Sequence, residues 1–179
     1  MRGPIGKGLQ VHATGKHIAF TTGTGVLPFL DLIAHLILKL LERNGGPAIL
    51  SELQQESNRM CDIEETKAEN VIIDLNNFSL ELHTSFETED EAIGLDLINL
   101  LSEMTQKIGM TSLFYHNMRI GSRDEHVTDR YDSTNLYAKF QEYENFSFNI
   151  RKVWACGTPL MQEHFENAVR RLDNPRIIY

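Results

Sequence analysis

The segment from His17 to Leu41 constrains the fold more than any other part of the sequence. An apolar stretch, His17–Phe20, runs into a turn rich in glycine and threonine, and a strongly apolar segment, Phe29–Leu41, follows Pro28. A strand, a small-residue turn and a helix in this order place backbone N–H groups and a positive helix end where a phosphate can sit. The segment therefore predicts a phosphate-binding unit. The alternative is an ordinary connection between a strand and a helix.

Composition limits the classes of protein to which the chain can belong. The chain has 179 residues, 41% of them hydrophobic and 23% charged, which is typical of one globular domain, and we expect a single domain over residues 1–179. The net charge of −8 argues against a nucleic-acid partner. The two cysteines lie far apart, and the seven histidines show no ligand spacing, so neither a disulfide framework nor a metal site is predicted.

The most apolar stretch, Val26–Leu41, is interrupted by Asp31, His35 and Lys39. We expect it to be too short and too polar to span a membrane, and to form a buried helix in which His35 is a satisfied core residue. Because the two cysteines suggest no disulfide framework, a reducing, intracellular compartment is the default. We therefore expect a cytoplasmic location, either for a free protein or for the cytosolic part of a membrane-bound parent.

Strand and helix patterns alternate along the chain. Gln10–Phe20 predicts a short strand pair, and 45–77 an insertion or flexible loop. The acidic run Glu87–Glu91 suits the beginning of a helix. Later strands are expected at 80–86, 111–115 and 152–156, and later helices at 92–107, 135–143 and 160–172. This order predicts an α/β fold, a Rossmann-like parallel sheet with helices on both faces, whose ligands bind beyond the carboxyl ends of the strands.

Four motifs in this order resemble the nicotinamide-binding domain of the ferredoxin–NADP reductase superfamily, which includes cytochrome-b-type reductases, ferric reductases and NADPH oxidases. They are Gly3–Gly8 (GPxGxG in the family), Thr22–Pro28 (GGTGxxP), Thr88–Asp90 with the helix after it, and Cys156–Met161 (CGPxxM). In the family an FAD-binding barrel precedes the first motif, and no flavin-binding motif is present here. The resemblance implies that residues 1–9 are the end of the linker from that barrel.

The resemblance also implies roles for individual residues. Gly23, Thr24 and Gly25, flanked by Thr22 and Pro28, would hold the pyrophosphate of NAD(P)H. Cys156 would help to position the nicotinamide ring for hydride transfer to FAD, in a pocket shaped by Gly157, Thr158 and Met161. From the residues alone, the alternative for Cys156 is a buried cysteine on a core strand, although its position between Ala155 and Gly157 favours the functional role. Met161 is equally a packing residue of the last helix.

The choice between NADH and NADPH is left open by the sequence, with a lean towards NADPH. Family members hold the 2′-phosphate after the third strand, where this chain has Arg119, Arg123, Arg130 and Tyr131. A solvated mixed-charge loop is the alternative. Tyr179 ends the sequence, as an aromatic residue that stacks on the flavin does in some family members, or as a residue at an arbitrary boundary.

Two positions depart from the family pattern: Thr22 replaces the first glycine of its turn, and Thr158 replaces a proline. A threonine is tolerable at position 22 if its φ is negative.

The predicted function is to orient NAD(P)H for hydride transfer to FAD on another domain of the same parent protein, with an unidentified electron acceptor. The chain by itself is expected to be inactive. A non-catalytic relative that keeps the fold for assembly or regulation is the alternative.

Overall fold

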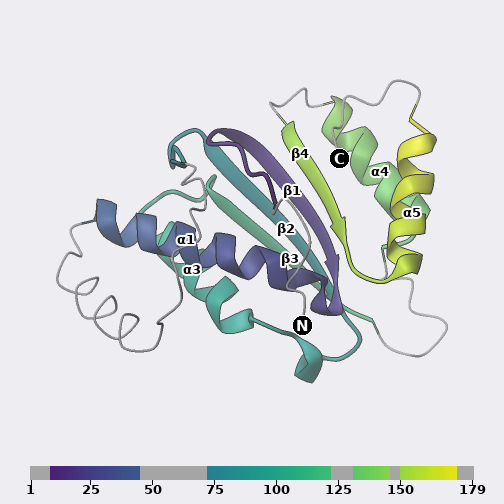
Figure 1. Ribbon diagram of the computed structural model, residues 1–179, viewed down its shortest axis with the longest axis horizontal. Helices are drawn as coiled ribbons and strands as arrows, with labels where there is room; N and C mark the ends of the chain where they lie inside the picture. The colour runs from purple at the N-terminus through teal and green to yellow at the C-terminus, as the bar shows by residue number, and fades with distance from the viewer. Residues whose placement is uncertain (1–8, 45–71, 122–130, 146–149, 173–179) are drawn as a thin grey trace, which may run out of the picture.

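The computed structural model describes residues 9–44, 72–121, 131–145 and 150–172 (Figure 1). Within these residues, strands and helices alternate. The strands are β1 (Gly15–Thr22), β2 (Phe78–Phe86), β3 (Phe114–Ile120) and β4 (Ile150–Cys156). The helices are η1 (Gly23–Val26), α1 (Leu27–Arg43), η2 (Glu89–Glu91), α3 (Leu95–Lys107), α4 (Ser133–Asn145) and α5 (Pro159–Arg170).

The described strands form one parallel sheet in the order β3-β2-β1-β4. The chain moves outwards from β1 through β2 to β3, and then returns to place β4 on the other side of β1. The order therefore reverses between β1 and β4. Ligands of open parallel sheets bind at such a switch point, outside the carboxyl ends of the strands. In this chain Thr21 pairs with Cys156 at that edge.

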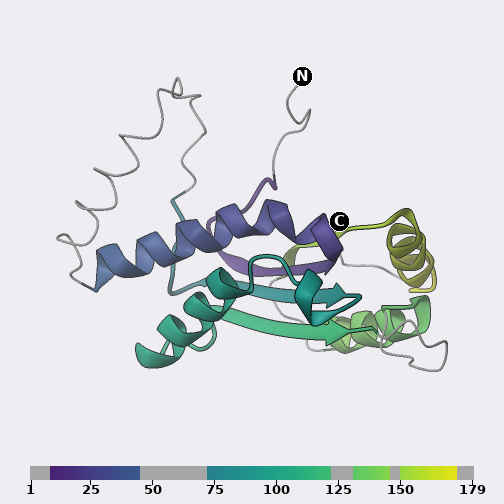
Figure 2. The same cartoon turned by 90° about the horizontal axis from the view of Figure 1, so that it is seen from below.

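Helices cover both faces of the sheet, as the sequence predicted (Figures 1 and 2). Successive side chains of a strand point to opposite faces, so Ala19 packs under α1 and α3, whereas Ile18 and Phe20 pack under α4 and α5. The core on the first face also takes Leu80 and Leu82 from β2. The α/β class and the two-sided covering are thus confirmed.

Helix α1 is longer than expected. With η1 it spans 21 residues, Gly23–Arg43, and is long and apolar enough to cross a membrane by length and composition alone. Core helices meet the same criterion, and one stripe of this helix, which includes Phe29, Ile33 and Leu36, is fully buried against the sheet. The prediction that His35 is a satisfied core residue is not confirmed, because the residue is half-buried and its Nε2 has no hydrogen-bond partner among the described residues.

The predicted beginning of α3 was wrong by three residues. The acidic residues Glu89–Glu91 form a separate turn, and the helix begins only after Gly94, whose φ is +74°. This left-handed conformation favours glycine, and it redirects the chain immediately before Leu95. A side chain at position 94 would also collide with the Leu30 side chain on α1, so Gly94 allows the two helices to approach.

Two strand predictions also differ from the structure. Within Gln10–Phe20 the described residues form only the beginning of β1, and 9–14 are not a strand. The third strand is Phe114–Ile120 rather than 111–115, because residues 111–113 form a turn whose Leu113 carbonyl accepts the Leu80 N–H group. Of the predicted insertion, 45–71 lie outside the described residues; in the remainder, Ile73 and Leu75 belong to the core.

Candidate functional site

The glycine–threonine turn leads directly from β1 into α1. Gly23 has a φ of +51°, and no atom of a described residue outside its own turn lies within 4 Å of where its side chain would be. In the part of the chain that the structure describes, no side chain caps the first N–H groups of η1 or α1. Pro28 is exposed in the first turn of α1, where it needs no N–H partner. The positive end of a long helix is therefore accessible beside a glycine that leaves room for a ligand.

Gly25 is in contact with the other predicted motif. A side chain at this position would overlap the carbonyl group of Cys156 and the nitrogen of Gly157. Residues 131 positions apart in the sequence are therefore packed backbone against backbone at the switch point. This contact joins the Gly23–Gly25 turn and the Cys156–Gly157 turn into one continuous surface, which we call the seam.

Thr22 and Thr158 form a second contact across the seam. The backbone N–H of Thr158 donates to the Thr22 hydroxyl oxygen at 3.2 Å. The Thr158 hydroxyl oxygen in turn accepts the Met161 N–H at 3.3 Å and caps α5. Thr22 has a φ of −128°, which meets the condition under which threonine can replace glycine there.

Cys156 lies half-buried at the end of β4. Burial raises the pKa of its thiol, so the group is protonated at neutral pH. A thiol rather than a thiolate is a poor nucleophile. Met161 is only 3% exposed and packs with Phe165 in the core under α4 and α5, so its side chain does not face the seam.

Arg119 lies at the carboxyl end of β3, at the same edge of the sheet as the seam but two strands away from β1. Its guanidinium group stacks on the Tyr131 ring, with 4.6 Å from Cζ to the ring centroid. Tyr131 is buried and packs edge-on against Phe20. The structure thus brings two of the predicted 2′-phosphate residues together. Arg123, Arg130, Tyr179 and the Gly3–Gly8 motif lie outside the described residues.

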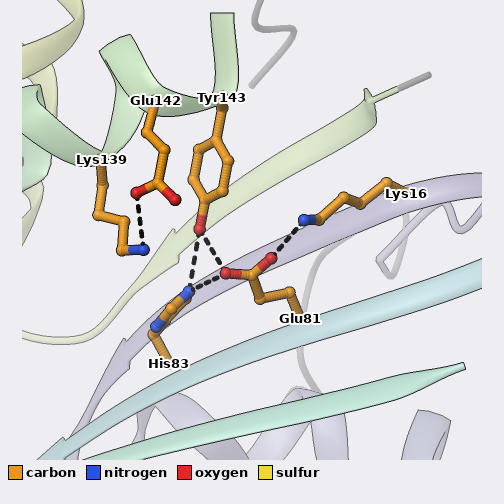
Figure 3. A network of polar contacts seen from close by, with 6 residues as sticks. All are labelled: Lys16, Glu81, His83, Lys139, Glu142 and Tyr143. Atoms are coloured by element: carbon orange, nitrogen blue, oxygen red, sulfur yellow. Dashed lines mark hydrogen bonds and ion pairs between the residues drawn. The ribbon is translucent and has the colours of Figure 1, made fainter. Parts of the chain in front are cut away.

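A buried polar network lies between β2 and α4, and the sequence analysis missed it (Figure 3). The Glu81 carboxylate accepts hydrogen bonds from the Tyr143 hydroxyl at 2.6 Å and from His83 Nε2 at 2.7 Å, and it forms an ion pair with Lys16 at 2.5 Å. Glu81, His83 and Tyr143 are all less than 10% exposed. Their signal in the sequence was weak: two polar residues at alternate positions of an apolar strand, which share one face of the sheet.

The network keeps a charge inside the protein. Burial alone would raise the pKa of Glu81, but the bonds from His83, Lys16 and Tyr143 outweigh it and lower the pKa to about 2. Burial, and then the bond to Glu81, raise the pKa of Tyr143 far above its usual range. Glu81 pairs with Ile18, four residues before Thr22, so the network lies about 13 Å from the seam along the strand. It fixes α4 to the sheet rather than forming part of the seam.

A hollow of about 590 Å³ lies at the opposite edge of the sheet, lined in part by Thr14, Lys16, Asn77 and Ser112. It lies at the amino ends of the strands, whereas ligands of parallel sheets bind at the carboxyl ends. Lys16, the one charged side chain that the described residues contribute to its lining, is already paired with Glu81. We therefore assign the candidate site to the seam.

Solved structures share this fold. A ferredoxin-NADP+ reductase from Plasmodium falciparum superposes with a TM-score of 0.51 at 13% sequence identity, over 89% of this chain and 49% of that one. The structure of that enzyme with 2'P-AMP gives a TM-score of 0.51 at 14% identity, over 88% and 49% of the two chains. This chain thus spans about half the length of the structures it matches. No family model and no curated protein matches the sequence. The fold is ferredoxin reductase-like, as the motifs predicted.

Proposed function

We propose that this chain is the NAD(P)H-binding domain of an FAD-dependent oxidoreductase, and that it orients the nicotinamide towards FAD held by another domain of the same parent protein. One observation carries the proposal: Gly25 is packed against Cys156–Gly157 at the switch point of a parallel sheet. Two motifs that the resemblance assigns to the pyrophosphate and to the nicotinamide of one dinucleotide are thereby brought into one surface.

The residues present fit such a ligand. The pyrophosphate would lie over Gly23, where there is open space beside the uncapped beginning of α1. The nicotinamide would lie against the Cys156 thiol and the Gly157 backbone. The bound cofactors supply the hydride chemistry, and this chain supplies binding and orientation. Because the flavin would belong to a separate domain, we expect the chain by itself to bind dinucleotide weakly and to be inactive.

For the nucleotide, NADPH is favoured over NADH. The support is the position of Arg119, a guanidinium group at the carboxyl edge of β3 that is held in place by stacking on Tyr131. A planar guanidinium pairs well with a phosphate group. The location would be cytoplasmic, whether the parent is free or membrane-bound, and the electron acceptor would be another domain of the parent or another protein.

The experiment compares two substitutions at Gly23. Asn and Asp both tolerate a positive φ and have nearly the same size, so Gly23→Asn and Gly23→Asp differ mainly in charge. Calorimetry or saturation-transfer NMR would measure the binding of NADPH and NADH to each folded variant. We expect Gly23→Asp to weaken binding roughly tenfold more than Gly23→Asn, because a carboxylate at the helix N-terminus repels the pyrophosphate.

Equal affinity of the two variants would place the pyrophosphate elsewhere. If the wild-type chain binds neither dinucleotide at millimolar concentration, the domain is instead a non-catalytic relative that serves assembly or regulation. The observation that favours this non-catalytic function is the pair of departures from the family pattern, Thr22 and Thr158.

A further inference from the structure

Thr22 and Thr158, which both depart from the family pattern, contact one another. The Thr22 hydroxyl accepts the backbone N–H of Thr158. Proline has no N–H group, so this contact exists only because position 158 is not proline. Glycine has no hydroxyl, so it exists only because position 22 is not glycine. Each departure supplies the partner that the other one needs.

The backbone at position 158 would accept proline without change. Thr158 has φ −65° and ψ 155°, which are the values that proline prefers and that suit a residue before Pro159. Backbone conformation therefore does not explain the threonine. Compared with proline, Thr158 adds two hydrogen bonds. Its backbone N–H donates to the Thr22 hydroxyl, and its own hydroxyl accepts the Met161 N–H.

The same contact closes the seam at its centre. A side chain on Gly157 would overlap the Thr22 hydroxyl, and one on Gly25 would overlap the Cys156 carbonyl. No group can enter between the two turns, so a dinucleotide must lie across them. Its pyrophosphate and its nicotinamide are joined through a single ribose, which limits the distance between them, and the two turns must lie within that distance.

We propose that Thr22 and Thr158 are a coupled positioning pair that sets the Cys156–Gly157 turn at the correct place relative to the Gly23–Gly25 turn for a ligand that spans both. This inference rests on the proposed function. The pair acts on the nicotinamide end of the ligand and not on the adenine end, because the Thr22 bond holds the beginning of α5 and leaves β2 and β3 untouched.

The test uses two matched pairs of variants. Thr22→Val keeps the shape and removes the acceptor, whereas Thr22→Ser keeps the acceptor. Thr158→Ala and Thr158→Pro both remove the α5 cap, and only Thr158→Pro also removes the N–H donor. Calorimetry measures the affinity of each protein for NADPH and for its fragment 2′-phospho-AMP, and for NADH and AMP if the wild type prefers NADH. Thermal unfolding establishes that each variant is folded.

We expect Thr22→Val to weaken dinucleotide binding roughly three- to tenfold, the effect of one hydrogen bond, and to leave binding of the fragment unchanged. Thr22→Ser should restore the affinity. Thr158→Pro should bind the dinucleotide more weakly than Thr158→Ala, and in a Thr22→Val background this difference should vanish. A merely structural role would lower the affinity for the dinucleotide and the fragment together.

Unchanged dinucleotide affinity in Thr22→Val, or a parallel loss for the fragment, would overturn the positioning role. So would a Thr158→Pro effect that persists when Thr22 is valine. The proposed function fails separately, in the wild type alone, if that protein binds no dinucleotide.

Discussion

Gly25 and the carbonyl group of Cys156 are packed so closely that no side chain fits at position 25. The obstacle is backbone, which cannot rotate away as a side chain can. This contact gives the turn after β1 and the turn after β4 a fixed relation, and the candidate site depends on it.

Gly25→Ala should therefore be costly in both stability and binding. We expect a loss of roughly 3 kcal/mol in unfolding free energy, at the upper end for an overpacked site. Gly109→Ala is the matched control, because Gly109 has a φ of +72° with open space around it and should lose about 1–2 kcal/mol from backbone strain alone. Urea unfolding measures both. Dinucleotide affinity should fall only in Gly25→Ala, and a well-tolerated alanine there would contradict the close contact.

Arg119→Ala should weaken NADPH binding about tenfold and leave NADH binding nearly unchanged, because only NADPH carries the 2′-phosphate. Arg43→Ala removes the same charge from the far end of α1, where Arg43 bonds to Asn76, and serves as the control. Calorimetry would measure the affinity of both variants for NADPH and for NADH. An equal loss for NADPH and NADH in Arg119→Ala would argue against a 2′-phosphate role.

Tyr143→Phe should destabilise the protein by about 2 kcal/mol, because it removes a hydrogen bond to a buried carboxylate. Tyr137→Phe is the control on the same helix, since the Tyr137 hydroxyl bonds only to the exposed Gln141 among the described residues. The pKa of Glu81 is lowered to about 2, so its contribution is present above pH 4.5 and is lost as the pH falls towards 2. The acid transition of Tyr143→Phe should accordingly move to higher pH, and identical transitions in the two variants would count against the network.

His17 should make the domain sensitive to mild acid. Its ring is stacked between Phe78 and Trp154, and burial lowers its pKa to about 4. The folded state then binds fewer protons than the unfolded state, so stability is full above pH 6.5 and is lost as the pH falls towards 4. The loss is on the order of 3 kcal/mol. His17→Phe should flatten the curve of unfolding free energy against pH in this window, and a curve parallel to that of the wild type would refute the assignment.

The sequence was sufficient for the parts of the fold that depend on local pattern. The apolar stripe of α1, the glycine–threonine turn and the alternation of strands and helices all follow from spacing along the chain. Element ends were less predictable. The beginning of α3 depends on Gly94 and its close approach to Leu30, which is a contact between distant segments. The same holds for β3, whose beginning depends on its pairing with β2.

The residues of the candidate site were named from the sequence through the resemblance of its motifs to a known family, and such motifs are a one-dimensional signal. The tertiary structure decided which of them meet: Gly25 with Cys156, Thr22 with Thr158, and Arg119 with Tyr131. It also placed Met161 in the core and united Glu81, His83 and Tyr143. The physical reason is the parallel sheet, whose long crossovers bring residues more than 100 positions apart to one edge. Local preference carries no information about such contacts.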